Sequence, residues 1–261
     1  MLKDITIGQY FPGDSILHRL DPRAKIIVVF LYIVALFVNS SWLANGILAV
    51  ITVAAMAMSG IHPSHILRGL RPMLFIILLT GVLNLFFTKG TPVLPGWIIT
   101  WEGMEKTVKM MLRITMLIIG TFLLTYTTSP MAITDGLEQL MNPLKKLHVP
   151  VHELTLIMSM ALRFIPTLIE ETDKIMSAQK SRGADFETGG LIKRAQALIP
   201  VLVPLFVSSF RRADELAVAM ESRCYHGGEG RTRMNQLVYT AKDAVAVILA
   251  AVLLILLILM R

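Results

Sequence analysis

The sequence predicts an all-α, polytopic membrane protein with about five transmembrane helices and a cytoplasmic helical domain that contains two long crossing helices. Hydrophobic residues make up 54% of the 261 residues, and the mean hydropathy is +0.65, above the range of soluble domains. These residues gather in runs that approach the roughly 20 residues a helix needs to span a bilayer. Residues 128–242 instead hold more than half of all Lys and Arg. We therefore expect three parts: 1–127 with four spans, 128–242 in the cytoplasm, and 243–261 with the last span.

The net charge of +7 and the single cysteine bear on the class of protein. Lys and Arg beside membrane spans are expected from topology alone, so the charge does not indicate binding to nucleic acid. Cys224 has no second cysteine for an internal disulfide and no zinc-binding spacing around it. The first residues are polar and include Pro12 and Pro22, so we expect no cleavable signal peptide.

The first three spans follow from apolar runs and from the charges between them. Residues 1–22 are predicted to lie at the cytoplasmic interface of the membrane. The runs at 26–38 and 43–58 predict a tight hairpin of two spans, whose turn lies outside because it carries no Lys or Arg. The connection at 61–72 carries two arginines and returns the chain to the cytoplasm before the third span at 73–87. A single re-entrant span in place of the hairpin would reverse this distribution of charge.

The rest of the chain predicts two more spans and a cytoplasmic region between them. The fourth span is expected at 108–126, after a loop whose tryptophans suit the outer interface. No stretch from 128 to 242 is expected to be apolar enough to span, and 133–147 predicts a short amphipathic helix. The fifth span is expected at 244–260. Five spans with a cytoplasmic N-terminus place the C-terminus outside.

Two long helices organise the cytoplasmic region, at 151–183 and 191–223. Apolar residues at steps of three and four mark one face of the first, and charged residues occupy the other. Both helices end in a serine followed by an arginine, and small residues beside the arginine let a partner's backbone approach. Docking onto partner proteins and a simple preference of arginine for a helix C-terminus explain these ends equally well. Aligning the two ends matches Asp173, Ala178, Ser181 and Arg182 with Asp214, Ala219, Ser222 and Arg223.

Three prolines lie inside the two helical patterns, at Pro166, Pro200 and Pro204. Each removes a backbone donor and bends its helix. The bend is either simple curvature or a hinge or crossing point, and the sequence leaves both open.

The sequence offers no catalytic, cofactor-binding or metal-binding site. His62 and His65 lack a third ligand nearby, so we expect no metal. No phosphate-binding loop with its lysine is present, and the zinc-protease and serine-hydrolase motifs are also missing. We expect a protein that is not an enzyme and binds no cofactor itself.

Three segments, 15–26, 162–186 and 220–228, together resemble the transmembrane T component of energy-coupling factor transporters. They read SILHRLDPRAKI, LRFIPTLIEETDKIMSAQKSRGADF and MESRCYHGG, and the resemblance extends over essentially the whole chain. It implies a scaffold subunit of an ABC-type importer of vitamins and metal ions in the plasma membrane. A small integral-membrane S component would bind the substrate, and two ATPase subunits would bind ATP and Mg²⁺. Region 128–242 would then be the cytoplasmic coupling domain.

The two short motifs of the family correspond here to Ser181-Arg182-Gly183 and Ser222-Arg223-Cys224. The resemblance implies that each arginine docks into a groove on one ATPase. Cys224 stands where glycine is usual, and cysteine tolerates positive φ poorly, so the sequence leaves open whether the second helix ends as the first does. ATP binding would move the two docking points together, and the long helices would carry that motion to the S component, held by their apolar faces and the first three spans.

Two other functions remain as alternatives. A pore-lining permease that contacts substrate directly would need polar groups at mid-bilayer depth, and the predicted spans offer few beyond Asn84 and the threonines of the fourth. A membrane enzyme that modifies lipids would show activity in the isolated subunit.

Overall fold

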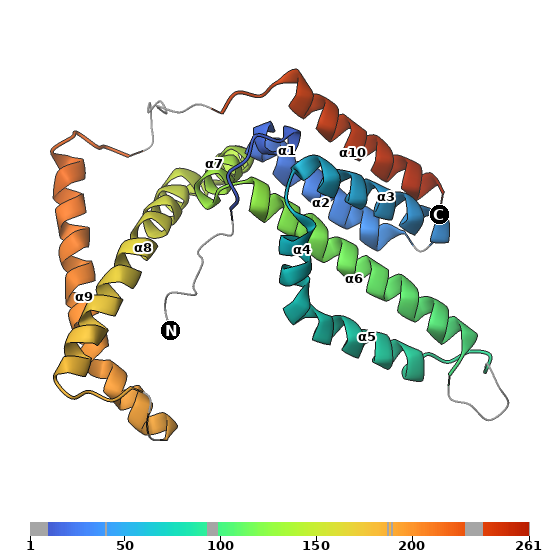
Figure 1. The fold of residues 1–261 in the computed structure, drawn as a ribbon. Helices are drawn as coiled ribbons and strands as arrows, with labels where there is room; N and C mark the ends of the chain where they lie inside the picture. The colour runs from blue at the N-terminus through green and yellow to red at the C-terminus, as the bar shows by residue number, and fades with distance from the viewer. Residues whose placement is uncertain are drawn as a thin grey trace. The chain divides into compact units, whose positions relative to one another are not determined.

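The computed structural model describes residues 10–39, 41–92, 99–186, 188, 190–227 and 237–260. The regular secondary structure within these ranges is helical, as predicted, apart from one isolated β-bridge between Pro92 and Thr100. In chain order (Figure 1), the helices are α1 (Ile16–Arg19), α2 (Pro22–Val38), α3 (Trp42–Ser59), α4 (Pro63–Leu70), η2 (Arg71–Met73), α5 (Leu74–Phe87), α6 (Trp101–Thr127), α7 (Pro130–Met141), η3 (Asn142–Leu147), α8 (Val151–Ser181), α9 (Leu191–Glu221) and α10 (Ala241–Leu259).

The chain divides into two compact units. The first, which we call the bundle unit, comprises Gly8–Leu140 and Gln236–Arg261. The second, which we call the crossed-helix unit, comprises Met1–Ile7 and Met141–Asn235 and contains α8 and α9.

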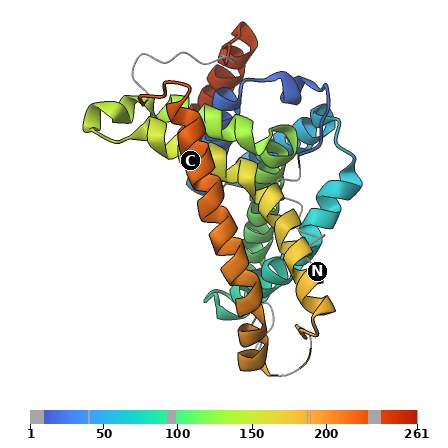
Figure 2. The same cartoon turned by 90° about the vertical axis from the view of Figure 1, so that its left-hand side faces the viewer.

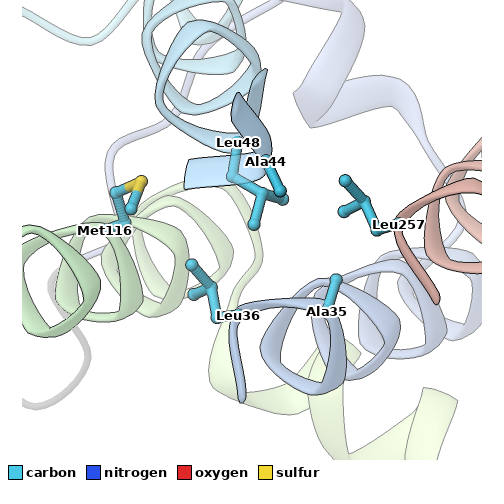
Figure 3. Packing of buried hydrophobic residues seen from close by; sticks show 6 residues of the cluster. All are labelled: Ala35, Leu36, Ala44, Leu48, Met116 and Leu257. Atoms are coloured by element: carbon cyan, nitrogen blue, oxygen red, sulfur yellow. The ribbon is translucent and has the colours of Figure 1, made fainter. Parts of the chain in front are cut away.

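The core of the bundle unit lies where α2, α3, α6 and α10 meet. Small residues let these helices approach, as is usual for helix packing in membranes. In Figure 3 the buried side chains from the four helices point toward a common space. They are Ala35, Leu36, Ala44, Leu48, Met116 and Leu257. A second buried cluster joins the region of α4 and α5 to the C-terminal half of α6, through Ile61, Ile66, Leu70, Ile77, Leu123 and Tyr126.

Six of the described helices are long and apolar enough to cross a membrane. Four of them, 42–59, 63–87, 101–127 and 241–259, correspond to predicted spans. The predicted first span is α2, which has 17 residues and is slightly short of the roughly 20 that a bilayer requires.

The other two candidates are α8 and α9, so the expectation that no stretch of 128–242 is apolar enough to span is wrong by length and composition. Each contains an apolar stretch of 18 residues that carries at most two charged residues. The reason is that charges are unevenly placed along each helix. In α8, for example, Glu170, Glu171 and Asp173 all follow a long apolar N-terminal part.

The amphipathic helix predicted at 133–147 is two elements. Helix α7 ends at Met141, and a 3-10 helix, η3, continues to Leu147. Pro143 stands at the start of η3, where its ring disfavours α-helical backbone at the residue before it.

Candidate functional site: two matched helix ends on a crossed pair

Helices α8 and α9 each have 31 residues and pack against each other in antiparallel directions. Figures 1 and 2 show the two long helices inclined to each other. At the crossing, the Glu171 carboxylate accepts hydrogen bonds from the Ser208 hydroxyl and from Arg212, whose Nη2 lies 2.7 Å from Oε2. This pairing of one acid with two donors defines where the helices meet.

A second contact depends on proline chemistry. Pro204 has no N–H, so the carbonyl of Pro200, four residues earlier, lacks its helical partner. The Gln179 side chain donates to that carbonyl across the crossing, with Nε2 3.4 Å from the oxygen. The structure thus places Pro200 at the helix contact, and the lost backbone bond of α9 is partly replaced by α8.

The C-terminal ends of the two helices have the same backbone geometry. In α8, the N–H groups of Gly183 and Ala184 donate to the carbonyls of Lys180 and Gln179, at 3.0 Å each. In α9, the corresponding N–H groups of Cys224 and Tyr225 donate to Glu221 and Met220, at 2.9 and 3.0 Å. This pair of bonds is the Schellman motif, which needs a left-handed residue after the helix.

The structure answers the question that the sequence left open, because Cys224 ends the second helix in the same way as Gly183 ends the first. Gly183 has φ of 89° and Cys224 has φ of 57°, so both occupy the left-handed region. The hydrogen bonds of the motif hold the cysteine in a conformation that its side chain disfavours. The two ends are therefore alike in geometry despite the different residues.

The motif side chains are free to meet a partner. Residues 181–183 and 222–224 are all exposed, and a Cβ added at Gly183 would meet no atom within 4 Å. Both serine hydroxyls turn back onto their own helices: Ser181 donates to Ser177 O at 3.1 Å and Ser222 to Val218 O at 2.8 Å. Each arginine therefore stands beside small groups that leave room for another backbone.

Arg182 and Arg223 lie far from the crossing and on opposite sides of it. Arg182 lies roughly 16 Å beyond Glu171 along α8, at 1.5 Å per residue. Arg223 lies roughly 22 Å beyond Ser208 along α9, in the opposite direction because the helices are antiparallel. One crossed pair thus presents two similar cationic ends at two well-separated points.

Helix α9 also exposes an apolar face. Its phenylalanines pair with each other, with the ring centroids of Phe206 and Phe210 5.7 Å apart, and both side chains are 64% exposed. A continuous exposed apolar surface marks contact with lipid or with another protein. The other large apolar residues exposed on this helix are Ile192, Leu198, Ile199, Leu202, Val203, Val207 and Val218.

Sequence reasoning singled out the arginine motifs and the prolines but missed the residues of the crossing: Glu171, Gln179, Ser208 and Arg212. Ser208 and Arg212 are four residues apart, so the sequence could have shown that both lie on one face of a helix. Their shared partner on another helix was not visible. His62 and His65 lie at the start of α4, and the described residues contain no group of three potential ligands placed to hold a metal ion.

The described residues form helices, six of them long and apolar enough to cross a membrane, which is the architecture of a polytopic membrane protein. Comparison with known proteins makes the class specific. Residues 13–234 match the family model described as cobalt transport protein. The chain belongs to this family of energy-coupling factor transporter transmembrane proteins, as the sequence resemblance indicated.

Its relatives match it over nearly their full length. The chain is 54% identical to the energy-coupling factor transporter transmembrane protein EcfT of Thermosediminibacter oceani, over 95% of this chain and 94% of that protein. It is 52% identical to the protein of the same name from Acidaminococcus fermentans, over 100% of this chain and 98% of the relative. The Bacillus subtilis EcfT is 47% identical, and the match covers 100% of both.

Proposed function

We propose that this chain is the membrane scaffold of an energy-coupling factor importer, which joins two ATPase subunits to a substrate-binding S component and transmits ATP-driven motion for micronutrient uptake. The relatives' name, energy-coupling factor transporter transmembrane protein, supports this assignment. In this proposal ATP and Mg²⁺ bind to the partner ATPases, and the substrate binds to the S component.

The identical geometry of the two helix ends carries the proposal. Arg182 and Arg223 each follow a small serine and precede a left-handed residue, and each is exposed. A planar guanidinium presented in this way bonds bidentately to a carboxylate or to backbone carbonyls in a groove. Two equal ends on one chain suit two homologous partners, with one motif for each ATPase.

The crossed pair acts as the lever. Glu171 with Ser208 and Arg212, and Gln179 with Pro200, join the helices, and both docking ends extend beyond these contacts. A displacement that brings the two arginines together therefore rotates the helices about their contact. Pro200 and Pro204 in α9 and Pro166 in α8 are the points at which the helices can bend. The exposed apolar face of α9 would hold the S component, together with the first three spans.

This function assigns the parts of the chain and their sides of the membrane. Residues 1–127 hold the first four spans, 128–242 form the cytoplasmic coupling domain and 243–261 form the last span. The N-terminus is cytoplasmic and the C-terminus is external, in agreement with the positions of Lys and Arg.

Reversing both docking charges tests the proposal. The double variant Arg182→Glu/Arg223→Glu is expected to lose at least about tenfold of its co-purifying ATPase, because truncating or reversing a buried charge pair costs about 2–5 kcal/mol. Membrane insertion should be unchanged. Arg194→Glu, at an exposed position in the first turn of α9, is the matched control. An unaltered yield of complex in the double variant would falsify docking at these ends.

A further inference from the structure

The chain leaves the bundle unit at the end of α7 and returns to it before α10, and both connections are held at the first turn of α2. We call this turn, with Asp21, Arg23 and Lys25, the anchor. Asp21 caps α2 by accepting from the Arg23 N–H at 2.8 Å, and Asp21 and Lys25 are buried. All the contacts described below lie within the bundle unit.

Arg23 holds the returning connection. Its Nε and Nη2 donate to the two carboxylate oxygens of Asp21 at 3.0 and 2.8 Å. This bidentate pair of hydrogen bonds, which we call the fork, fixes the orientation of the guanidinium. The same Nη2 donates to the carbonyl of Leu237 at 3.1 Å, and the guanidinium lies 5.5 Å from the centre of the Tyr239 ring. The segment that leads into α10 is thus bonded to the start of α2.

Asp243 joins the same two helix starts. One carboxylate oxygen accepts from the backbone N–H of Asp21 at 2.7 Å. The other accepts from the N–H and hydroxyl of Thr240, at 2.8 and 2.5 Å, which caps α10. Asp243 is 1% exposed, so this is a buried junction and not a surface pair.

The outgoing connection is held by packing and by Lys25. A Cβ added at Gly136, in α7, would lie 3.0 Å from the Pro22 Cβ and 3.3 Å from the Arg23 nitrogen, so α7 rests directly on the anchor. The Lys25 ammonium donates to the carbonyl of Thr127 at 2.9 Å and to the Thr128 hydroxyl at 3.0 Å, where α6 gives way to α7.

The signs of the charges match the ends of the helices. Carboxylates sit at the N-termini of α2 and α10, and an ammonium sits at the C-terminus of α6, as the helix dipoles favour. Buried charges of this kind are weak evidence for stability, because apolar side chains of similar volume often serve a fold equally well. These charges instead hold the segment between α6 and α7 and the segment before α10 in one defined position relative to α2.

We propose that the anchor is the fixed point against which the crossed-helix unit moves, and that Arg23, Asp243 and Gly136 are positioning residues for energy coupling. This inference rests on the proposed function. With the anchor loosened, the crossed helices could still bind ATPases and follow their closure, but the displacement would be absorbed at the connections before it reached the bundle.

The test uses the complete complex with its ATPases and S component, reconstituted in liposomes. Spin labels on Ala195→Cys, an exposed position of α9 outside the docking motifs, and on Met260→Cys, both in a Cys224→Gly background, report the distance between the crossed-helix unit and the bundle, with and without ATP and vanadate. Arg23→Gln removes the fork, and Gly136→Ala disturbs the packing without changing any charge. Arg19→Gln and Gly46→Ala are the controls, because Arg19 is exposed and a Cβ at Gly46 would meet nothing within 4 Å.

We expect both anchor variants to retain ATPase co-purification and hydrolysis but to lose the ATP-driven shift in distance, while both controls keep it. The inference is overturned if the anchor variants shift as the wild type does. It is also overturned if hydrolysis, complex yield and melting temperature all fall together, since a purely structural role would produce that. A wild-type chain that captures no ATPase would instead refute the proposed function itself.

Discussion

At residue scale, Cys224 is, with His148, one of two described non-glycine residues whose backbone is left-handed. Its φ of 57° places a residue with a Cβ in a region where only glycine is free of steric cost. The Schellman bonds from Cys224 and Tyr225 hold the chain there. The cysteine is exposed, so no packing of its side chain offsets the strain.

We therefore predict opposite effects of exchanging the two motif residues. Cys224→Gly should stabilise the end of α9 by about 1 kcal/mol, and Gly183→Cys should destabilise the end of α8 by a similar amount, because left-handed backbone costs about 1–2 kcal/mol without glycine. Hydrogen exchange of the last turn of each helix measures both.

Gly190 provides the control for this pair. It is the N-cap of α9, with φ of −72° and open space around it, so Gly190→Ala adds no left-handed strain and should leave hydrogen exchange in the last turns of α8 and α9 unchanged. Slower exchange in Gly183→Cys, or faster exchange in Cys224→Gly, would show that strain does not decide these ends.

At the scale of elements, the unusual feature is that α9 is completed by α8. The carbonyl that Pro204 leaves unpaired receives the Gln179 amide, so a defect in one helix becomes a contact between two. One contact between the two helices thus uses a carbonyl that Pro204, which lacks an N–H, leaves without a helical partner.

Restoring that bond should change the crossing. In Pro204→Ala the new N–H competes with Gln179 for the Pro200 carbonyl, so α9 should straighten and gain up to about 3 kcal/mol of helix stability. Spin labels on Ser181→Cys and the native Cys224 should show a shifted distance between the two docking ends.

Pro166→Ala is the matched comparison. Pro166 precedes the Glu171 contact, so straightening α8 there leaves the segment from the crossing to Arg182 unchanged. Equal distances in wild type and both proline variants would mean that Pro204 does not set the crossing.

Several elements were predictable from the sequence and others were not. The apolar runs predicted α3, α5, α6 and α10, because each run is a property of one segment. The division of 133–147 into α7 and η3 follows a local rule at Pro143 that hydrophobic periodicity does not reflect. For α8 and α9, the same apolar face suits a bilayer, a partner protein or a helix neighbour, so composition alone does not assign it.

At the scale of the whole molecule, the side of the membrane on which the crossed helices lie has a direct test. If α8 and α9 are cytoplasmic levers, Cys224 and Thr188→Cys should both react with a membrane-impermeant maleimide only in inside-out vesicles. If the two helices instead crossed the bilayer as a hairpin, Thr188→Cys, between them, would react from the opposite side to Cys224.

Two further positions complete this labelling experiment. In a Cys224→Ser background, Met260→Cys should react from outside, as five spans with a cytoplasmic N-terminus require. Tyr10→Cys should react from inside and serves as the internal reference. Labelling of both from one side would contradict the five-span topology.

The sequence by itself determined that the protein is an all-helical, polytopic membrane protein, because composition and the spacing of apolar residues are properties of single segments. Only the tertiary structure decided which residues join them. Asp21 and Asp243 are 222 positions apart, and Gly136 shows no special spacing, yet all three meet at one turn of α2. Likewise, Glu171 and Arg212 look like ordinary surface charges until the helices cross. A contact between distant segments has no local signal, because it depends on how the whole chain packs.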